Sequence, residues 1–168
     1  YAALKTAEKL GVDLSPEAYH QGFAQVNWPG RMEILQRHPP VVIDSAHNRY
    51  SAMRLRQAMD DYFPGFPIIL VFGASEDKDI DGMYQELLPR VKRVIATQSI
   101  HPRAIDPAKL VELAHRSGRS AEAVTTIEEA LEKAIVEAGG DSVILITGSV
   151  FIAAAARELF PQIKTAEM

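Results

Sequence analysis

Short, almost continuous runs of Val, Ile and Leu alternate with helical patterns along most of this chain. The runs at 68–72 (IILVF) and 143–146 (VILI) have the length of strands and leave no polar position on either face. Such strands are typical of a parallel sheet that is covered on both sides. The strand candidates are 31–36, 40–44, 67–73, 91–97 and 142–147, with a weaker one at 121–125.

Amphipathic helices are predicted in the intervals between these strands. At 48–63, Ala52, Leu55, Met59 and Tyr62 recur at spacings of three and four, which places them in one apolar stripe. A β-α-β-α order with short connections favours an open, doubly wound α/β sheet. The other helix candidates are 79–88, 106–116, 126–138 and 149–160.

Residues 1–27 differ from the rest of the chain. They predict two short helices, the second begun by Ser15 as cap and Pro16 in the first turn, and a junction follows near 27–30. The chain also starts with a tyrosine rather than a methionine. We interpret 1–27 as a helical tail that leads from an absent N-terminal domain into a second domain at 28–168.

Composition excludes several classes of function. The 18 basic and 22 acidic residues give a net charge of −4, whereas a domain that binds the phosphates of nucleic acid is expected to be basic. Because the sequence has no cysteine, it has no disulfide, thiolate zinc site or cysteine nucleophile. No apolar run approaches the roughly 18 residues that a membrane span needs. We therefore predict neither a nucleic-acid partner nor a membrane partner.

In such a sheet, ligands bind beyond the carboxyl ends of the strands, where loops lead into helices. Asp44 and His47 lie at one such end, where a carboxylate suits the two hydroxyls of a ribose and an imidazole suits a nucleotide. Spacing alone favours the alternative, in which Asp44 caps the next helix and His47 is an ordinary loop histidine. Two ligands do not make a closed metal site, and no G-x-S-x-G surrounds Ser45, so neither a metal centre nor a serine nucleophile is predicted.

Three further positions at this edge are candidates for binding an anion. Lys78 lies between two aspartates, Arg103 lies in a loop, and Ser149 opens a helix whose N–H groups attract negative charge. In the alternative, Asp79 caps a helix beside a solvated Lys78, Arg103 is an ordinary surface residue, and Ser149 is only a cap. The sequence has neither G-x-x-x-x-G-K-[ST] nor G-x-G-x-x-G. A nucleotide bound here would therefore need its triphosphate held mainly elsewhere.

Four segments together resemble the C-terminal domain of the bifunctional folylpolyglutamate synthase/dihydrofolate synthases, in the Mur ligase superfamily. They are WPGRME at 28–33, VVIDSAHN at 41–48, GASEDKD at 73–79 and TGS at 147–149. The resemblance spans residues 1–160 and implies a Rossmann-like, open, mostly parallel six-stranded sheet with helices on both faces. It also implies an ATP-dependent ligase that adds L-glutamate to a folate or a dihydropteroate through an acyl phosphate.

The resemblance assigns roles to individual residues. Arg31 contacts the phosphates of ATP, Asp44 holds the ribose, and His47 lies beside the nucleotide, so that Arg31 and His47 are the expected catalytic pair. The family's phosphate loop, Mg²⁺ ligands and carbamylated lysine lie on the N-terminal domain. ATP and Mg²⁺ are therefore the expected cofactors of a cytoplasmic monomer, and this domain alone is expected to be inactive. The candidates at the glutamate end of the cleft are Ser149, Lys78 and Arg103.

Two positions depart from the family's usual D-G-A-H-N-P. Ser45 replaces the glycine and adds a Cβ where backbone approaches the ligand, while Arg49 replaces the proline and either adds charge near the nucleotide or points into water. Two other functions stay open. One is a non-catalytic α/β binding or regulatory module. The other is a peptidoglycan-precursor Mur ligase, against which the W-P-G-R element and the missing D-N-P-R motif argue.

Overall fold

The six predicted strands are present and form one sheet. The computed structural model describes residues 1–166, with side chains for residues 1–163. The order of strands across the sheet is β1-β2-β6-β3-β4-β5, and every neighbouring pair is parallel except β1 with β2. The mostly parallel α/β fold is therefore confirmed. The strands are β1 (Glu33–Arg37), β2 (Pro40–Ile43), β3 (Ile68–Phe72), β4 (Val91–Ala96), β5 (Ser120–Ala123) and β6 (Val143–Thr147).

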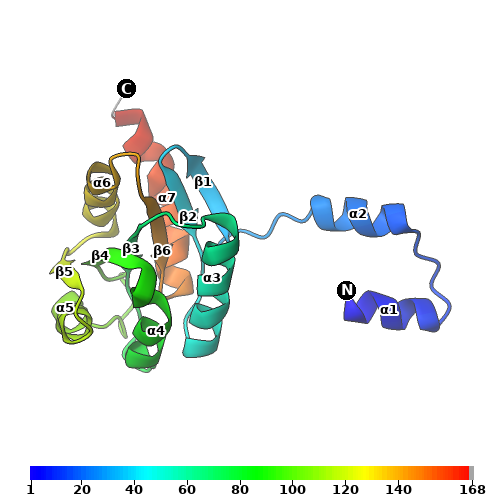
Figure 1. The fold of residues 1–168 in the computed structure, drawn as a ribbon, viewed down its shortest axis with the longest axis horizontal. Coiled ribbons are helices and arrows are strands. Elements are labelled where there is room, and N and C mark those ends of the chain that lie inside the picture. The colour runs from blue at the N-terminus through cyan, green and yellow to red at the C-terminus, as the bar shows by residue number, and fades with distance from the viewer. Residues whose placement is uncertain (167–168) are drawn as a thin grey trace.

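Helices connect the strands and cover both faces of the sheet (Figure 1). The helices that follow β2, β3 and β4 cover one face, and those that follow β5 and β6 cover the other. The helices on the first face are α3 (Arg49–Tyr62), α4 (Ile80–Leu87) with the 3₁₀ turn η1 (Leu88–Arg90), and α5 (Pro107–Arg116), and those on the second are α6 (Ile127–Ala138) and α7 (Val150–Ala166).

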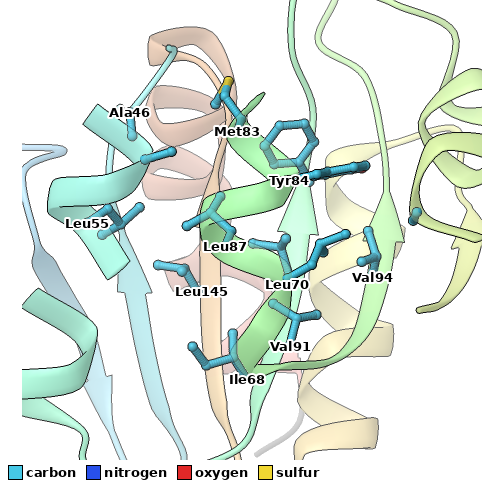
Figure 2. Close-up of a cluster of buried hydrophobic side chains, with 14 of the residues drawn as sticks. Ala46, Leu55, Ile68, Leu70, Met83, Tyr84, Leu87, Val91, Val94 and Leu145 are labelled. Carbon is cyan, nitrogen blue, oxygen red and sulfur yellow. The ribbon is translucent and has the colours of Figure 1, made fainter. Parts of the chain in front are cut away.

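The side chains of β3 show how two cores arise from one strand. Ile68, Leu70 and Phe72 pack on the side of α3, α4 and α5, and Ile69 and Val71 pack on the side of α6 and α7. Successive side chains of a strand point to opposite faces, so a strand covered on both sides is apolar at every position. Figure 2 shows the first of these cores. Burial on both faces of the sheet therefore explains the unbroken apolar runs in the sequence.

Three details differ from the sequence-based expectation. β1 begins two residues later than predicted, because Arg31 and Met32 occupy a turn in which Met32 has a φ of 44°. The spacing predicts Tyr62 in the apolar stripe of α3, but Tyr62 is 72% exposed, since it is the last residue of that helix. The final helix continues through Pro161, because the burial of Ile163 beyond it keeps the last turns against the core.

Two short helices precede the sheet and stand apart from it in Figure 1. They are α1 (Ala2–Lys9) and α2 (Pro16–Ala24), and neither contains a buried residue. Ser15 caps α2, as predicted, by accepting a hydrogen bond from the backbone N–H of Ala18. None of the helices in the described part of the chain is both long enough and apolar enough to cross a bilayer.

Candidate functional site

The loops that leave β2, β6, β3 and β4 lie side by side at one edge of the sheet. The N–H of Gly148 donates to the carbonyl of Ala46 at 3.1 Å, and the N–H of Gly73 donates to the carbonyl of Thr147 at 3.3 Å. The N–H of Thr97 continues the series to the carbonyl of Phe72 at 2.9 Å. The polar segments after the parallel strands therefore share one edge, as the strand order requires.

Two glycines allow these loops to approach closely. Gly148 has a φ of +112°, and a Cβ on it would lie 2.5 Å from the carbonyl oxygen of Gly73. A Cβ on Gly73 would lie 2.6 Å from the carbonyl oxygen of Thr97. Any larger residue at either position would therefore push the loops of the candidate site apart.

Asp44 lies at the end of β2 with 8% of its surface exposed. Its Oδ1 accepts a hydrogen bond from the N–H of Ala46 at 2.8 Å, and its Oδ2 accepts one from the N–H of Met32 at 2.9 Å. A carboxylate has about four lone-pair positions, so these two bonds leave capacity for two more donors. Asp44 does not cap α3, which corrects the structural alternative. Asn48 does so, because its Oδ1 accepts from the N–H of Ser51 at 2.8 Å.

The turn between the tail and β1 is fastened to the end of β2 and to α7. The N–H of Ser45 donates to the carbonyl of Gly30 at 2.8 Å, and the N–H of Gly30 donates to Glu33 Oε2 at 2.7 Å. Glu33 in turn forms an ion pair with Arg157 of α7 at 2.9 Å. Sequence reasoning missed this use of Glu33, although a carboxylate three residues after a turn glycine was a signal for it.

Arg31 projects from this turn and is exposed. Its backbone N–H donates to the carbonyl of Trp28 at 3.2 Å, whereas its guanidinium has no hydrogen-bond or ion-pair partner within the described part of the chain. Arg31 and Asp44 line the same hollow of about 260 Å³, together with residues from the first turns of α3. The structure thus brings together a buried carboxylate with spare acceptor capacity and an uncommitted guanidinium.

His47 follows on the same loop and is exposed. Its Nδ1 lies 3.0 Å from the carbonyl oxygen of Ser45, a contact in which Nδ1–H donates and Nε2 is left as an acceptor. His47 does not line the hollow that Arg31 and Asp44 share. It lies three residues along the chain from Asp44, at the same edge of the sheet.

Lys78 and Arg103 meet at a third residue, Asp77. Lys78 Nζ lies 2.7 Å from Asp77 Oδ2, and Arg103 Nη1 lies 4.0 Å from Asp77 Oδ1. The hydrogen bond from Lys78 holds the pKa of Asp77 below its usual range. Asp79 caps α4 as predicted, through the N–H of Gly82 at 2.9 Å. Lys78 is therefore paired rather than simply solvated, and the two cations form a cluster apart from Asp44.

Ser149 and Arg49 both have structural partners. Ser149 is 5% exposed and caps α7, with its Oγ accepting from the N–H of Ile152 at 3.2 Å. Arg49 does not line the hollow, and its side chain is 57% exposed but paired. Its Nε lies 3.2 Å from Glu86 Oε1, and the pair ties α3 to α4. Among the described residues, no group of three or more His, Asp or Glu side chains could hold a metal ion.

The sequence is similar to a known protein family and to several known enzymes. Residues 30–150 match the family described as Mur ligase, glutamate ligase domain. A probable bifunctional folylpolyglutamate synthase/dihydropteroate synthase of Haloferax volcanii is 33% identical over 156 residues, which are 92% of this chain and 18% of that protein. A UDP-N-acetylmuramyl-tripeptide synthetase of Lactobacillus acidophilus is 33% identical over 155 residues, 85% of this chain and 29% of that protein.

A solved structure gives the same fold. The Mycobacterium tuberculosis folylpolyglutamate synthase complexed with ADP superposes with a TM-score of 0.82 at 33% identity, covering 90% of this chain and 36% of that one. The chain thus spans between a fifth and about a third of the relatives named here.

Proposed function

The chain belongs to the Mur ligase family with the glutamate ligase domain, and we propose that it forms the part of an ATP-dependent folate–glutamate ligase that holds ATP at Asp44 and Arg31. One observation carries the proposal. A buried, pre-oriented carboxylate and a free guanidinium line one hollow at the ligand-binding edge of the sheet. The ADP named with the Mycobacterium tuberculosis relative supports a nucleotide as the ligand.

Asp44 would bind the sugar end of the nucleotide. Two of its lone-pair positions are occupied by the N–H groups of Met32 and Ala46, and the other two can accept the 2′- and 3′-hydroxyls of a ribose. Because the carboxylate is already fixed by two hydrogen bonds, little conformational entropy is lost when the ribose binds.

Arg31 would act at the phosphate end. In the proposed reaction a carboxylate oxygen of the folate attacks the γ-phosphorus and ADP leaves. The amine nitrogen of glutamate then attacks the acyl carbon, and inorganic phosphate leaves. Arg31 offsets the negative charge on the phosphates during the first step, in which charge stabilisation and positioning carry most of the catalysis. We place the ligands of Mg²⁺ on another domain, since the described residues offer no such cluster.

The second substrate, L-glutamate, would bind along the same edge. Lys78 and Arg103 already converge on a carboxylate, that of Asp77, and this is the arrangement that an incoming glutamate carboxylate would share. His47 and the α7 terminus at Ser149 lie on neighbouring loops of this edge. We therefore propose Lys78, Arg103 and Ser149 for the glutamate end of the cleft, and we propose His47 for the position beside the nucleotide, where it acts with Arg31.

The remaining parts of the site would come from an N-terminal domain. We propose that 1–27 is the connection to that domain and that 28–168 is the ligase domain proper. In support, α1 and α2 stand apart from the sheet (Figure 1), and Trp28 at the junction is 69% exposed. An ATP-consuming reaction of this kind belongs in the cytoplasm, where we place the enzyme.

The test is a ligation assay on the full-length gene product that contains this chain. We expect release of ADP that depends on L-glutamate together with a reduced folate or dihydropteroate, and loss of that activity in Arg31→Ala. The similarity to a UDP-N-acetylmuramyl-tripeptide synthetase favours a peptidoglycan precursor as the second candidate substrate. ADP release with a UDP-N-acetylmuramyl peptide, and none with any folate, would replace the first function by the second. If the protein ligates neither a folate nor a UDP-N-acetylmuramyl peptide, both ligase functions are rejected in favour of a non-catalytic binding or regulatory module.

A further inference from the structure

We propose that Tyr50 forms the wall against which the nucleoside of ATP rests, and that Arg54 is the positioning residue that holds the ring there. The inference rests on the proposed function, because it needs a nucleotide at Asp44. Tyr50 and Arg54 line the same hollow as Arg31 and Asp44. No family motif identified above includes either residue.

The first turns of α3 carry Tyr50 and Arg54 one helical turn apart, so they lie on the same side of the helix. Asn48 caps this end of α3 through a reciprocal pair of contacts with Ser51, which fixes where the helix begins. The position of the Tyr50 backbone relative to Asp44 is therefore set by rigid structure on both sides. The side chain of Tyr50 therefore borders the hollow in the present structure, and the loop between β2 and α3 does not have to move.

The side chain of Tyr50 is exposed yet held in one orientation. It is 63% exposed, and its Oη accepts hydrogen bonds from Arg54 Nη2 at 3.0 Å and from Arg54 Nε at 3.2 Å. The guanidinium carbon also lies 5.3 Å from the ring centroid. Arg54 is itself tethered, because its Nη1 donates to Gln57 Oε1 at 3.0 Å. Because the ring is already held in one orientation, it loses little conformational entropy when a ligand stacks on it.

The chemistry of the hollow points to a nucleoside rather than to another anion. Asp44 repels carboxylates and phosphates but accepts hydroxyl donors, so it selects the sugar. A base attached to that sugar must lie against a neighbouring wall, and every nucleobase has a flat face that stacks on an aromatic ring. Tyr50 is the aromatic residue of this hollow, and the exposed guanidinium of Arg31 supplies positive charge for the phosphates attached to the nucleoside.

The chain provides a matched control on the same helix. Tyr62 is 72% exposed at the other end of α3 and does not line the hollow. Replacing either tyrosine removes an exposed ring from α3, but only the replacement of Tyr50 removes a ring beside Asp44. The comparison therefore separates nucleoside contact from general effects on the helix.

The experiment is calorimetric titration of the full-length gene product with the non-hydrolysable nucleotide AMPPNP and, separately, with inorganic tripolyphosphate. We expect Tyr50→Ala and Tyr50→Leu to weaken AMPPNP binding roughly tenfold, and Tyr50→Phe to weaken it by no more than about threefold, because it keeps the ring and loses only the Oη that Arg54 holds. Arg54→Ala should weaken AMPPNP about threefold, through the ring that it no longer orients. Tripolyphosphate, which has no nucleoside, should bind the Tyr50 variants as it binds the parent, and Tyr62→Ala should change nothing.

The inference is overturned if both Tyr50→Ala and Tyr50→Leu bind AMPPNP within twofold of the parent, or if they lose AMPPNP and tripolyphosphate to the same extent. Asp44→Asn, measured alongside, separates this failure from that of the proposed function. If Asp44→Asn weakens AMPPNP binding and the Tyr50 variants do not, the proposed role of Tyr50 is rejected and the nucleotide site at Asp44 is supported. Unchanged binding in all of them rejects both.

Discussion

The Oδ2 atom of Asp44 accepts a hydrogen bond from the backbone N–H of Met32 across 2.9 Å, although the two residues lie on different sides of the β1–β2 hairpin. The carboxylate proposed to hold a ribose therefore also anchors the turn that carries Arg31. One side chain links the sugar end of the candidate site to its phosphate end. A change at Asp44 is consequently expected to affect both binding and the stability of the turn.

Asp44→Ala should destabilise the fold. It leaves the N–H groups of Met32 and Ala46 without their buried acceptor, and each such loss costs about 1–3 kcal/mol, so we expect a decrease in the free energy of unfolding of about 2–6 kcal/mol. Urea denaturation measures it. Asp141→Ala, at an exposed carboxylate with no hydrogen-bond partner among the described residues, is the control. Equal, small effects of the two substitutions would refute the anchoring role of Asp44.

Gly148→Ala should cost more than Gly140→Ala. Both glycines have a positive φ, +112° and +123°, so both substitutions introduce backbone strain. Only at Gly148 would the new Cβ also collide with a backbone oxygen, that of Gly73 at 2.5 Å, whereas Gly140 faces open space. We expect thermal unfolding to show an additional loss of at least about 1–2 kcal/mol for Gly148→Ala. Matching losses would mean that the loops can separate freely.

Arg31→Ala should abolish most activity without affecting the fold. Arg31 is exposed and unpaired among the described residues, so its removal should change the free energy of unfolding by less than about 0.5 kcal/mol. Loss of a charge-stabilising donor should lower kcat of the full-length ligase by roughly 100-fold. Arg49→Ala, which breaks an ion pair with Glu86 outside the hollow, should leave kcat unchanged. A similar fall in kcat for both variants would contradict the specific role of Arg31.

Glu122 on β5 should contribute to the pH dependence of stability. The hydrogen bond from Lys133, with further help from Arg93, lowers the pKa of Glu122 below its ordinary value of 4.5. A carboxylate with a lowered folded-state pKa stabilises the protein fully above its unfolded pKa and loses that effect as the pH falls through the folded-state pKa. The stability difference between the parent and Glu122→Gln should therefore be constant above about pH 6 and shrink below about pH 4.5. Thermal unfolding at a series of pH values that extends above about pH 6 and below about pH 4.5 measures this stability difference.

The control for this pH dependence is Glu112→Gln. Glu112 is exposed and forms no ion pair within the described residues. The difference in stability between the parent and Glu112→Gln should therefore stay small at every pH. A difference for Glu122→Gln that grows on acidification would show that the sign of the pKa shift is wrong.

Strand and helix positions could be predicted because burial on both faces leaves a direct mark on the sequence. Every position of β3 and of β6 is buried, and apolar runs follow from that alone. The sequence likewise predicts Ser15 and Asp79 as caps, because capping depends on residues three positions apart. Local rules were sufficient wherever the interaction itself was local.

Contacts between distant segments could not be predicted in the same way. The pairing of Glu33 with Arg157 joins residues that are far apart in the chain, and the pairing of Arg49 with Glu86 depends on how α3 packs against α4. Asp44 was read as either a ligand or a helix cap, whereas its partner Met32 belongs to the preceding turn. Nor does spacing show that Tyr50 borders the same hollow as Arg31.

The most direct test of a ribose at Asp44 is to compare the affinity of ATP with that of 2′,3′-dideoxy-ATP, in the parent and in Asp44→Asn, by calorimetry on the full-length gene product. If Asp44 holds the ribose hydroxyls, the parent should bind the dideoxy nucleotide at least roughly tenfold more weakly than ATP, and Asp44→Asn should lose most of that discrimination. Circular dichroism confirms that the variant is folded. A variant that discriminates between the two nucleotides as strongly as the parent would show that the ribose does not lie on Asp44.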